Sequence, residues 1–114
     1  PTLCEMLEMK IPDSVEGKSF YKMFANDDFE TRKDLYFVYN NLLRSVKDKQ
    51  YKLIEYRNYA WKTELFDLIN DPDEMNNLAN DAEVKQRLTE LLLFYKESWG
   101  DERHEFGKSY WNNY

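Results

Sequence analysis

The sequence is poor in the residues on which most active sites are built. Its one cysteine, Cys4, excludes an intrachain disulfide, and its apolar neighbours indicate a small buried side chain. Its one histidine, His104, has no second histidine in the chain with which to form a metal site or a catalytic dyad. Its three glycines, Gly17, Gly100 and Gly107, are too scattered for a glycine-rich phosphate loop. The sequence therefore argues against a disulfide scaffold, a histidine-based site and a nucleotide-binding loop.

Long apolar runs and positive charge are also scarce. No run approaches the roughly 18 residues of a membrane span, and no signal-peptide pattern opens the chain. The net charge of −6 argues against nonspecific binding to nucleic acid. Hydrophobic residues make up 42% of the 114 residues and aromatic residues 17%, which suits one folded domain with a modest core. The chain starts at Pro1 rather than at Met, which fits a fragment or a processed product.

Four short apolar segments predict β-strands at 35–39, 42–47, 51–56 and 64–68. The connections between them are too short for crossovers, so the strands should pair antiparallel. The last strand should end at the turn around Pro72, because proline cannot donate to a sheet ladder and disfavours helix in the residue before it. We expect the Asn77 side chain to fix this exit by bonding to nearby backbone.

The remaining periodic segments predict helices. A long helix should start at Asn80, which can form a capping pair with Glu83, and should end at Gly100. Its apolar stripe comprises Val84, Leu88, Leu91, Leu92, Tyr95 and Trp99. Short helical segments are expected within Pro1–Met9 and after Ser19. The expected fold is α+β, a small antiparallel sheet of about four strands packed on one long C-terminal helix, with a short helical N-terminal segment. The sequence does not predict how residues 100–114 pack against the rest of the chain.

The first predicted strand raises a question of burial. Leu35–Tyr39 is apolar on both alternations, so both of its faces should be covered. One long helix can cover only one face of a four-stranded sheet. Pro1–Phe24 could supply part of the second cover, and a missing larger domain would supply the rest. Burial therefore predicts that the chain is a piece of a larger protein.

Several motifs, in order along the chain, carry a family resemblance. They are Pro1-Thr2-Leu3, Pro12 with Gly17-Lys18-Ser19-Phe20, Arg44-Ser45-Val46-Lys47, Tyr51-Lys52-Leu53-Ile54, and Leu65-Phe66-Asp67-Leu68 followed by Asp71-Pro72, Glu74 and Asn77-Leu78. This series resembles the C-terminal subdomain of type I, formylglycine-dependent sulfatases of the alkaline-phosphatase-like superfamily. The resemblance covers most of the chain and thins after Glu97.

The resemblance implies a non-catalytic fragment of a sulfuric ester hydrolase, which buttresses the catalytic domain and can shape the substrate entrance. Residues 1–28 would lead in from the catalytic domain, 29–99 would form the subdomain, and 100–114 would be a tail. The parent sulfatase would use a divalent metal, calcium, and a formylglycine made within a Cys/Ser-x-Pro/Ala-x-Arg motif. Cys4 departs from that motif at every later position, so we expect no catalytic residue, no cofactor and no activity in the fragment alone. A bacterial parent is expected to be periplasmic or secreted.

Two stretches are candidates for contact with substrate. Asn40 and Asn41 lie between predicted strands, where some sulfatases bring a loop of this subdomain to the pocket rim. Arg57, Trp61 and Lys62 combine cations with a flat aromatic ring, which suits a sulfated sugar, with charge for the sulfate and stacking for the ring. The alternative for this second loop is that it packs on its own or the neighbouring domain.

The acids near Pro72 could suggest a calcium loop. Asp71, Asp73 and Glu74 have part of that spacing, but Met75 occupies a ligand position and the central glycine is missing. Turn formation and negative charge near a helix start explain these acids better, so we expect no metal site here.

The expected partners are the catalytic domain of the same parent chain and a sulfated glycan, with no nucleic acid and no membrane span. The alternative function is a free-standing module that binds a glycan or a protein. A Cys/Ser-x-Pro/Ala-x-Arg motif encoded upstream would separate the two.

Overall fold

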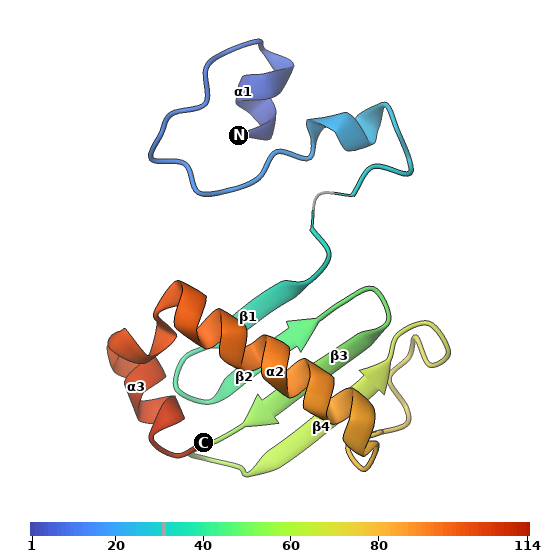
Figure 1. The fold of residues 1–114 in the computed structure, drawn as a ribbon, viewed down its shortest axis with the longest axis vertical. Coiled ribbons are helices and arrows are strands. Elements are labelled where there is room, and N and C mark those ends of the chain that lie inside the picture. The colour runs from blue at the N-terminus through green and yellow to red at the C-terminus, as the bar shows by residue number, and fades with distance from the viewer. Residues whose placement is uncertain (31) are drawn as a thin grey trace. The chain divides into compact units, whose positions relative to one another are not determined.

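The computed structural model describes residues 1–30 and 32–114, which form two compact units, Pro1–Lys33 and Asp34–Tyr114. The first unit contains helix α1, Thr2–Met6, and a short 3-10 helix η1, Tyr21–Phe24 (Figure 1). Helix α1 is shorter than the segment predicted from Pro1 to Met9, because Glu8 adopts a left-handed conformation with φ of 54°. Ser19 accepts the Tyr21 amide at 3.2 Å, which confirms a short helix after Ser19.

The second unit is built on a four-stranded antiparallel sheet in the order β1-β2-β3-β4 (Figure 1). The strands span Leu35–Tyr39, Leu43–Lys47, Tyr51–Tyr56 and Lys62–Asp67. All four predicted strands are confirmed, although β4 begins two residues earlier than the apolar run that predicted it. The β2–β3 hairpin is fixed by Asp48, whose carboxylate accepts the amides of Gln50 and Tyr51 at 2.8 and 2.7 Å.

The exit from the sheet depends on Asn77. Its side-chain oxygen accepts the amides of Leu65 and Ala79, both at 3.0 Å. Its side-chain nitrogen donates to the Thr63 carbonyl at 3.1 Å, and the next residue, Leu78, donates its amide to the Leu65 carbonyl at 2.7 Å. Residues 77 and 78 therefore satisfy backbone groups on the outer edge of β4. The role predicted for Asn77 is confirmed.

Helix α2, Ala82–Trp99, crosses one face of the sheet (Figure 1). Its cap is Asp81 rather than the predicted Asn80, because it is the Asp81 carboxylate that accepts the Val84 amide, at 3.2 Å. The helix ends as predicted at Gly100, whose φ of 62° is the left-handed conformation that glycine adopts most easily.

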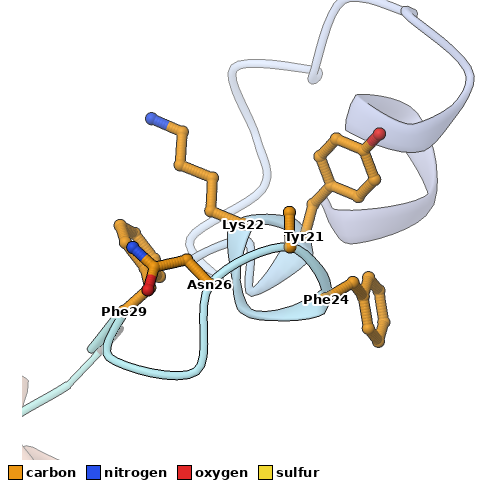
Figure 2. A pocket seen from close by; sticks show the side chains of 6 residues that line it. Tyr21, Lys22, Phe24, Asn26 and Phe29 are labelled. Carbon is orange, nitrogen blue, oxygen red and sulfur yellow. The ribbon is translucent and has the colours of Figure 1, made fainter.

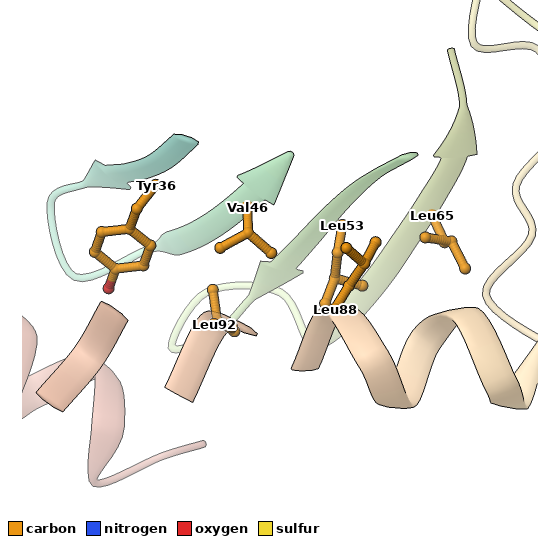
Figure 3. Close-up of a cluster of buried hydrophobic side chains, with 6 residues drawn as sticks. All are labelled: Tyr36, Val46, Leu53, Leu65, Leu88 and Leu92. Carbon is orange, nitrogen blue, oxygen red and sulfur yellow. The ribbon is translucent and has the colours of Figure 1, made fainter. Parts of the chain in front are cut away.

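The apolar core lies between α2 and the sheet. Tyr36, Val46, Leu53 and Leu65 are register partners in one row across the four strands, and Leu88 and Leu92 of α2 pack onto that row (Figure 3). Leu91 and Tyr95 are partly buried beside this cluster. The predicted stripe is wrong at its last member, since Trp99 is 67% exposed and contacts the Tyr36 ring only with its edge.

The opposite face of β1 is open. Leu35, Phe37 and Tyr39 alternate with the buried Tyr36 and remain 37%, 45% and 60% exposed. Within the unit Asp34–Tyr114, the second face of this strand therefore lacks the cover that its apolar pattern predicts. Burial of one face and exposure of the other agree with the idea that a further domain supplies the missing cover.

The C-terminal segment, residues 100–114, folds onto the α2 side of the sheet. It contains a 3-10 helix, η2, at Asp101–Arg103 and a helix, α3, at Glu105–Trp111. Tyr110 of α3 is fully buried, and its hydroxyl donates to the Glu55 carbonyl of β3 at 2.9 Å. Gly107 has no room for a side chain, because an added Cβ would lie 1.9 Å from the Asp101 carbonyl oxygen.

Candidate functional site

The two loops predicted to contact substrate lie at the same end of the sheet. They are the β1–β2 turn, residues 40–42, and the β3–β4 connection, residues 57–61, which we call the rim loops. An antiparallel meander places alternate turns at one end. The Arg57 amide donates to the Leu42 carbonyl at 2.8 Å and joins the two loops directly.

The first rim loop is held mainly by hydrogen bonds from other side chains to its backbone carbonyls. Asn40 has a left-handed φ of 51°, and its carbonyl accepts a hydrogen bond from Arg44 at 2.7 Å. The Asn41 carbonyl accepts the side-chain amide of Asn58 at 2.6 Å. The Asn41 side chain donates to the Ser109 hydroxyl at 3.3 Å. Asn40 is exposed, whereas Asn41 is partly buried and its side chain forms a hydrogen bond with the C-terminal segment.

Arg57 is the centre of the second rim loop. Its guanidinium carbon lies 5.0 Å from the Trp61 ring centroid and 4.8 Å from that of Tyr114, so two aromatic rings flank it. One terminal nitrogen donates to a Glu55 carboxylate oxygen at 3.0 Å and to the Tyr56 carbonyl at 2.6 Å. The side chain is thereby anchored to the protein and only 12% exposed.

The outer residues of the second rim loop are accessible. Tyr59 and Trp61 are 93% and 67% exposed, and the Trp61 ring is braced by Arg57 on one side. Lys62, the first residue of β4, is also exposed and forms an ion pair with Glu64 two residues along the strand. This end of the sheet therefore presents an indole ring in contact with Arg57, and the cation of Lys62, to solvent.

A buried ion pair lies behind the rim loops. Arg44 is fully buried and donates two hydrogen bonds to Asp101, at 2.5 and 3.1 Å. Asp101 also accepts the Tyr36 hydroxyl at 2.8 Å and the Trp111 indole N–H at 2.7 Å. The Tyr110 ring lies under the guanidinium at 4.5 Å. Sequence reasoning assigned no role to Asp101, and no local pattern distinguishes it from any other acid after a helix.

The pKa shifts follow from this burial. Burial alone would raise the pKa of Asp101, but its hydrogen bonds, that from Arg44 first, outweigh it and hold the pKa below the usual value. Burial, reinforced by the hydrogen bond to Asp101, raises the pKa of the Tyr36 hydroxyl well above its usual value. Burial likewise raises the pKa of Tyr110. These tyrosines are neutral hydrogen-bond donors at neutral pH, so this cluster is a structural network.

The acids near Pro72 do not fit a calcium site. The two Asp71 carboxylate oxygens accept the amides of Met75 and Asn76 at 3.0 and 2.8 Å. Glu74 forms an ion pair with Lys52. Within residues 1–30 and 32–114, no group of three or more His, Cys, Asp or Glu side chains is placed to hold a metal ion. The carboxylates instead stabilise the loop that leads from β4 to α2.

The first unit carries a shallow pocket of about 550 Å³. It is lined by Tyr21, Lys22, Phe24, Ala25, Asn26 and Phe29 (Figure 2). Figure 2 shows Tyr21 and Phe24 on a different side of η1 from Lys22, so the lining groups do not converge on one point. None of the predicted contact residues lies here. No helix in the described part of the chain is long and apolar enough to cross a membrane.

Comparison with known proteins places this fold among the sulfatases. Residues 1–97 match the family described as N-sulphoglucosamine sulphohydrolase, C-terminal. The chain belongs to this family, and the resemblance seen in its motifs is confirmed. The motif residues now have structural roles, since Leu65 lies in the core and Asn77 closes the edge of β4.

Individual relatives agree with the family. An N-acetylglucosamine-6-O-sulfatase of Bacteroides thetaiotaomicron is 26% identical over 109 residues, which cover 86% of this chain and 20% of that protein. An arylsulfatase of Clostridium perfringens is 31% identical over 108 residues, covering 90% of this chain and 22% of that protein. A structure solved in complex with its substrate D-glucosamine-2-N,6-O-disulfate shares the fold, with a TM-score of 0.73 at 24% identity over 89% of this chain and 23% of its own. The chain thus spans about a fifth of the length of these relatives and corresponds to the C-terminal part of a sulfatase.

Proposed function

We propose that this chain acts as the non-catalytic C-terminal module of a sulfuric ester hydrolase and that the open face of its sheet packs against the catalytic domain of the same polypeptide. The observation that carries this proposal is the exposure of Leu35, Phe37 and Tyr39 on the side of β1 away from α2. An exposed row of large apolar side chains on a folded sheet is typical of a contact surface. Membership of a family of C-terminal regions supports the preceding part of the same protein as the occupant.

The chemistry of the whole protein would then lie outside these residues. A formylglycine would supply the nucleophile and a calcium ion would polarise the sulfate. Near Pro72, Asp71 bonds backbone amides and Glu74 pairs with Lys52, so we assign no ligand of that ion to these two acids. This chain would support the catalytic domain and, through the rim loops, help to bind the substrate.

We further propose that the rim loops contact a sulfated sugar. The exposed face of Trp61 would stack on a sugar ring, and Lys62 would add positive charge near the sulfate. Arg57 would brace the indole from behind. Asn40 and Asn41 would border the same entrance. The disulfated glucosamine bound by the structural relative is the first substrate to test.

A paired substitution tests the docking surface. Phe37 and Phe106 are almost equally exposed, at 45% and 46%, but only Phe37 lies on the open face. In the 114-residue chain, Phe37→Asp and Phe106→Asp should each change the free energy of unfolding by about 1 kcal/mol or less. In the polypeptide extended through its upstream coding sequence, Phe37→Asp should lower the thermal midpoint and Phe106→Asp should not. Equal effects of the two substitutions in the extended protein would contradict docking through this face.

A separate experiment tests whether this chain is non-catalytic. The purified 114-residue chain should not hydrolyse an aryl sulfate, whereas the extended polypeptide should, and its upstream sequence should contain a Cys/Ser-x-Pro/Ala-x-Arg motif. Turnover by the short chain that survives repurification would refute a non-catalytic role. If the motif is missing and the short chain binds a sulfated sugar by itself, the free-standing binding module is correct instead.

A further inference from the structure

The C-terminal segment lies beyond the family match, which ends at residue 97, yet it contacts both rim loops. The Ser109 hydroxyl accepts the Asn41 side-chain amide at 3.3 Å. The Asn113 side chain donates to the Asn58 side-chain oxygen at 2.6 Å. The Tyr114 ring flanks the guanidinium of Arg57 at 4.8 Å. A segment outside the matched region therefore contacts Asn41, Asn58 and Arg57 directly, and it contacts Trp61 through Arg57.

We infer that residues 109–114 are a positioning element that sets the arrangement of the rim loops. This inference rests on the proposed role of those loops in binding a sulfated sugar. Asn113 and Tyr114 act through Asn58 and Arg57, and Arg57 in turn braces the Trp61 ring. Members of the family that carry a different sequence after the matched region would present this indole differently.

The second rim loop needs such support. Asn58 is held at a φ of 69°, a conformation that costs free energy in a residue other than glycine. Residues 58–61 are all exposed, so few apolar contacts fix them. The polar contacts of Asn58 with Asn41 and Asn113, at 2.6 Å each, replace the missing apolar ones.

The support is itself rigid. Helix α3 is anchored by the buried Tyr110, whose hydroxyl bonds the β3 backbone, and by Trp111, whose indole N–H bonds Asp101. The close approach of Gly107 to Asp101 fixes the start of the same helix. Asn113 and Tyr114 therefore follow directly after an anchored helix and can hold the second rim loop in one arrangement. A loop that is already ordered loses less conformational entropy when it binds a sugar.

The first test measures loop order in the 114-residue chain. The variants are Asn113→Ala and Tyr114→Ala, and the matched control is Asn112→Ala, an exposed neighbour whose side chain makes no hydrogen bond within the described part of the chain. The amides of Arg57 and Tyr59 bond the Leu42 and Arg57 carbonyls at 2.8 and 2.9 Å, and their hydrogen exchange should accelerate about fivefold in the two variants, in line with the loss of one hydrogen bond or one cation–π contact. The control should exchange like the parent chain. Unchanged exchange in both variants overturns the inference.

The second test measures the functional consequence in the extended enzyme, with D-glucosamine-2-N,6-O-disulfate and with a small aryl sulfate. Asn113→Ala and Tyr114→Ala should raise KM for the sugar about fivefold, leave its kcat nearly unchanged, and leave both constants unchanged for the aryl sulfate. Trp61→Ala is the benchmark for the loop itself. If Trp61→Ala raises KM for the sugar and the two variants do not, the positioning role is wrong while the rim proposal stands. If Trp61→Ala has no effect, the rim proposal fails and this inference with it.

Discussion

The buried pair of Arg44 and Asp101 allows the sharpest test of how the fold is held together. Arg44→Met keeps an unbranched apolar stem and removes the guanidinium group. The Asp101 carboxylate then retains the Tyr36 hydroxyl and the Trp111 indole as donors but loses both bonds to Arg44. Breaking one side of a buried ion pair leaves an uncompensated charge, so we expect a loss of about 3–5 kcal/mol.

The reverse substitution completes a double-mutant cycle. Asp101→Asn preserves the shape of the side chain but leaves the fully buried guanidinium of Arg44 without its counter-charge. The doubly substituted chain should be more stable than the sum of the two single losses predicts, with a coupling energy of at least about 1 kcal/mol. Urea denaturation should be followed by far-UV circular dichroism, because the indole of Trp111 contacts Asp101 and its fluorescence would change locally.

A surface pair provides the matched control. Arg87 bonds the Asp48 carboxylate at 2.7 Å, but its side chain is 53% exposed. Arg87→Met should therefore cost about 1 kcal/mol or less. If Arg44→Met is no more damaging than Arg87→Met, or if the cycle is additive within about 0.5 kcal/mol, the C-terminal segment does not lock the sheet through Asp101.

Three further predictions follow from the core, the edge of β4 and the titration of one acid. Leu88→Ala and Leu92→Ala should each cost about 2–5 kcal/mol in chemical denaturation, because both side chains are fully buried, whereas Leu93→Ala, at a position 37% exposed, should cost about 1 kcal/mol or less. Asn77→Leu should cost about 1–2 kcal/mol through the backbone groups it leaves unpaired, and an unchanged denaturation midpoint would show that the edge closes without it. Hydrogen bonds from the backbone and then the side chain of Asn70 lower the pKa of Asp67 to about 2 from 3.8, so stability should fall as pH decreases from about 4 to about 2. Asp67→Asn should flatten this dependence, and an identical pH profile in the variant would rule Asp67 out as its source.

The strands and the long helix could be read from the sequence because their signals are local. Alternation predicts strands and a 3.6-residue period predicts the helix, and a glycine after the last periodic residue marks its end at Gly100. The role of Asn77 could also be predicted, since an asparagine that follows a proline turn has backbone groups within reach of its short side chain. The choice between Asn80 and Asp81 as the cap was not, because adjacent residues can both cap and only the entry angle of the chain selects one.

Tertiary structure alone decided which distant residues meet. Arg44 and Asp101 are 57 residues apart, and nothing near either of them in sequence marks the other as its partner. The exposure of Trp99 has the same origin, since its ring meets the rings of Tyr36 and Tyr95 edge to face and remains 67% exposed. The grouping of Asn41, Arg57 and Tyr114 depends on the order of the strands and on where α3 is anchored. Short-range patterns determined the elements of this protein and the antiparallel order that brings the two rim loops to one end of the sheet, whereas long-range contacts determined that the C-terminal segment joins them there.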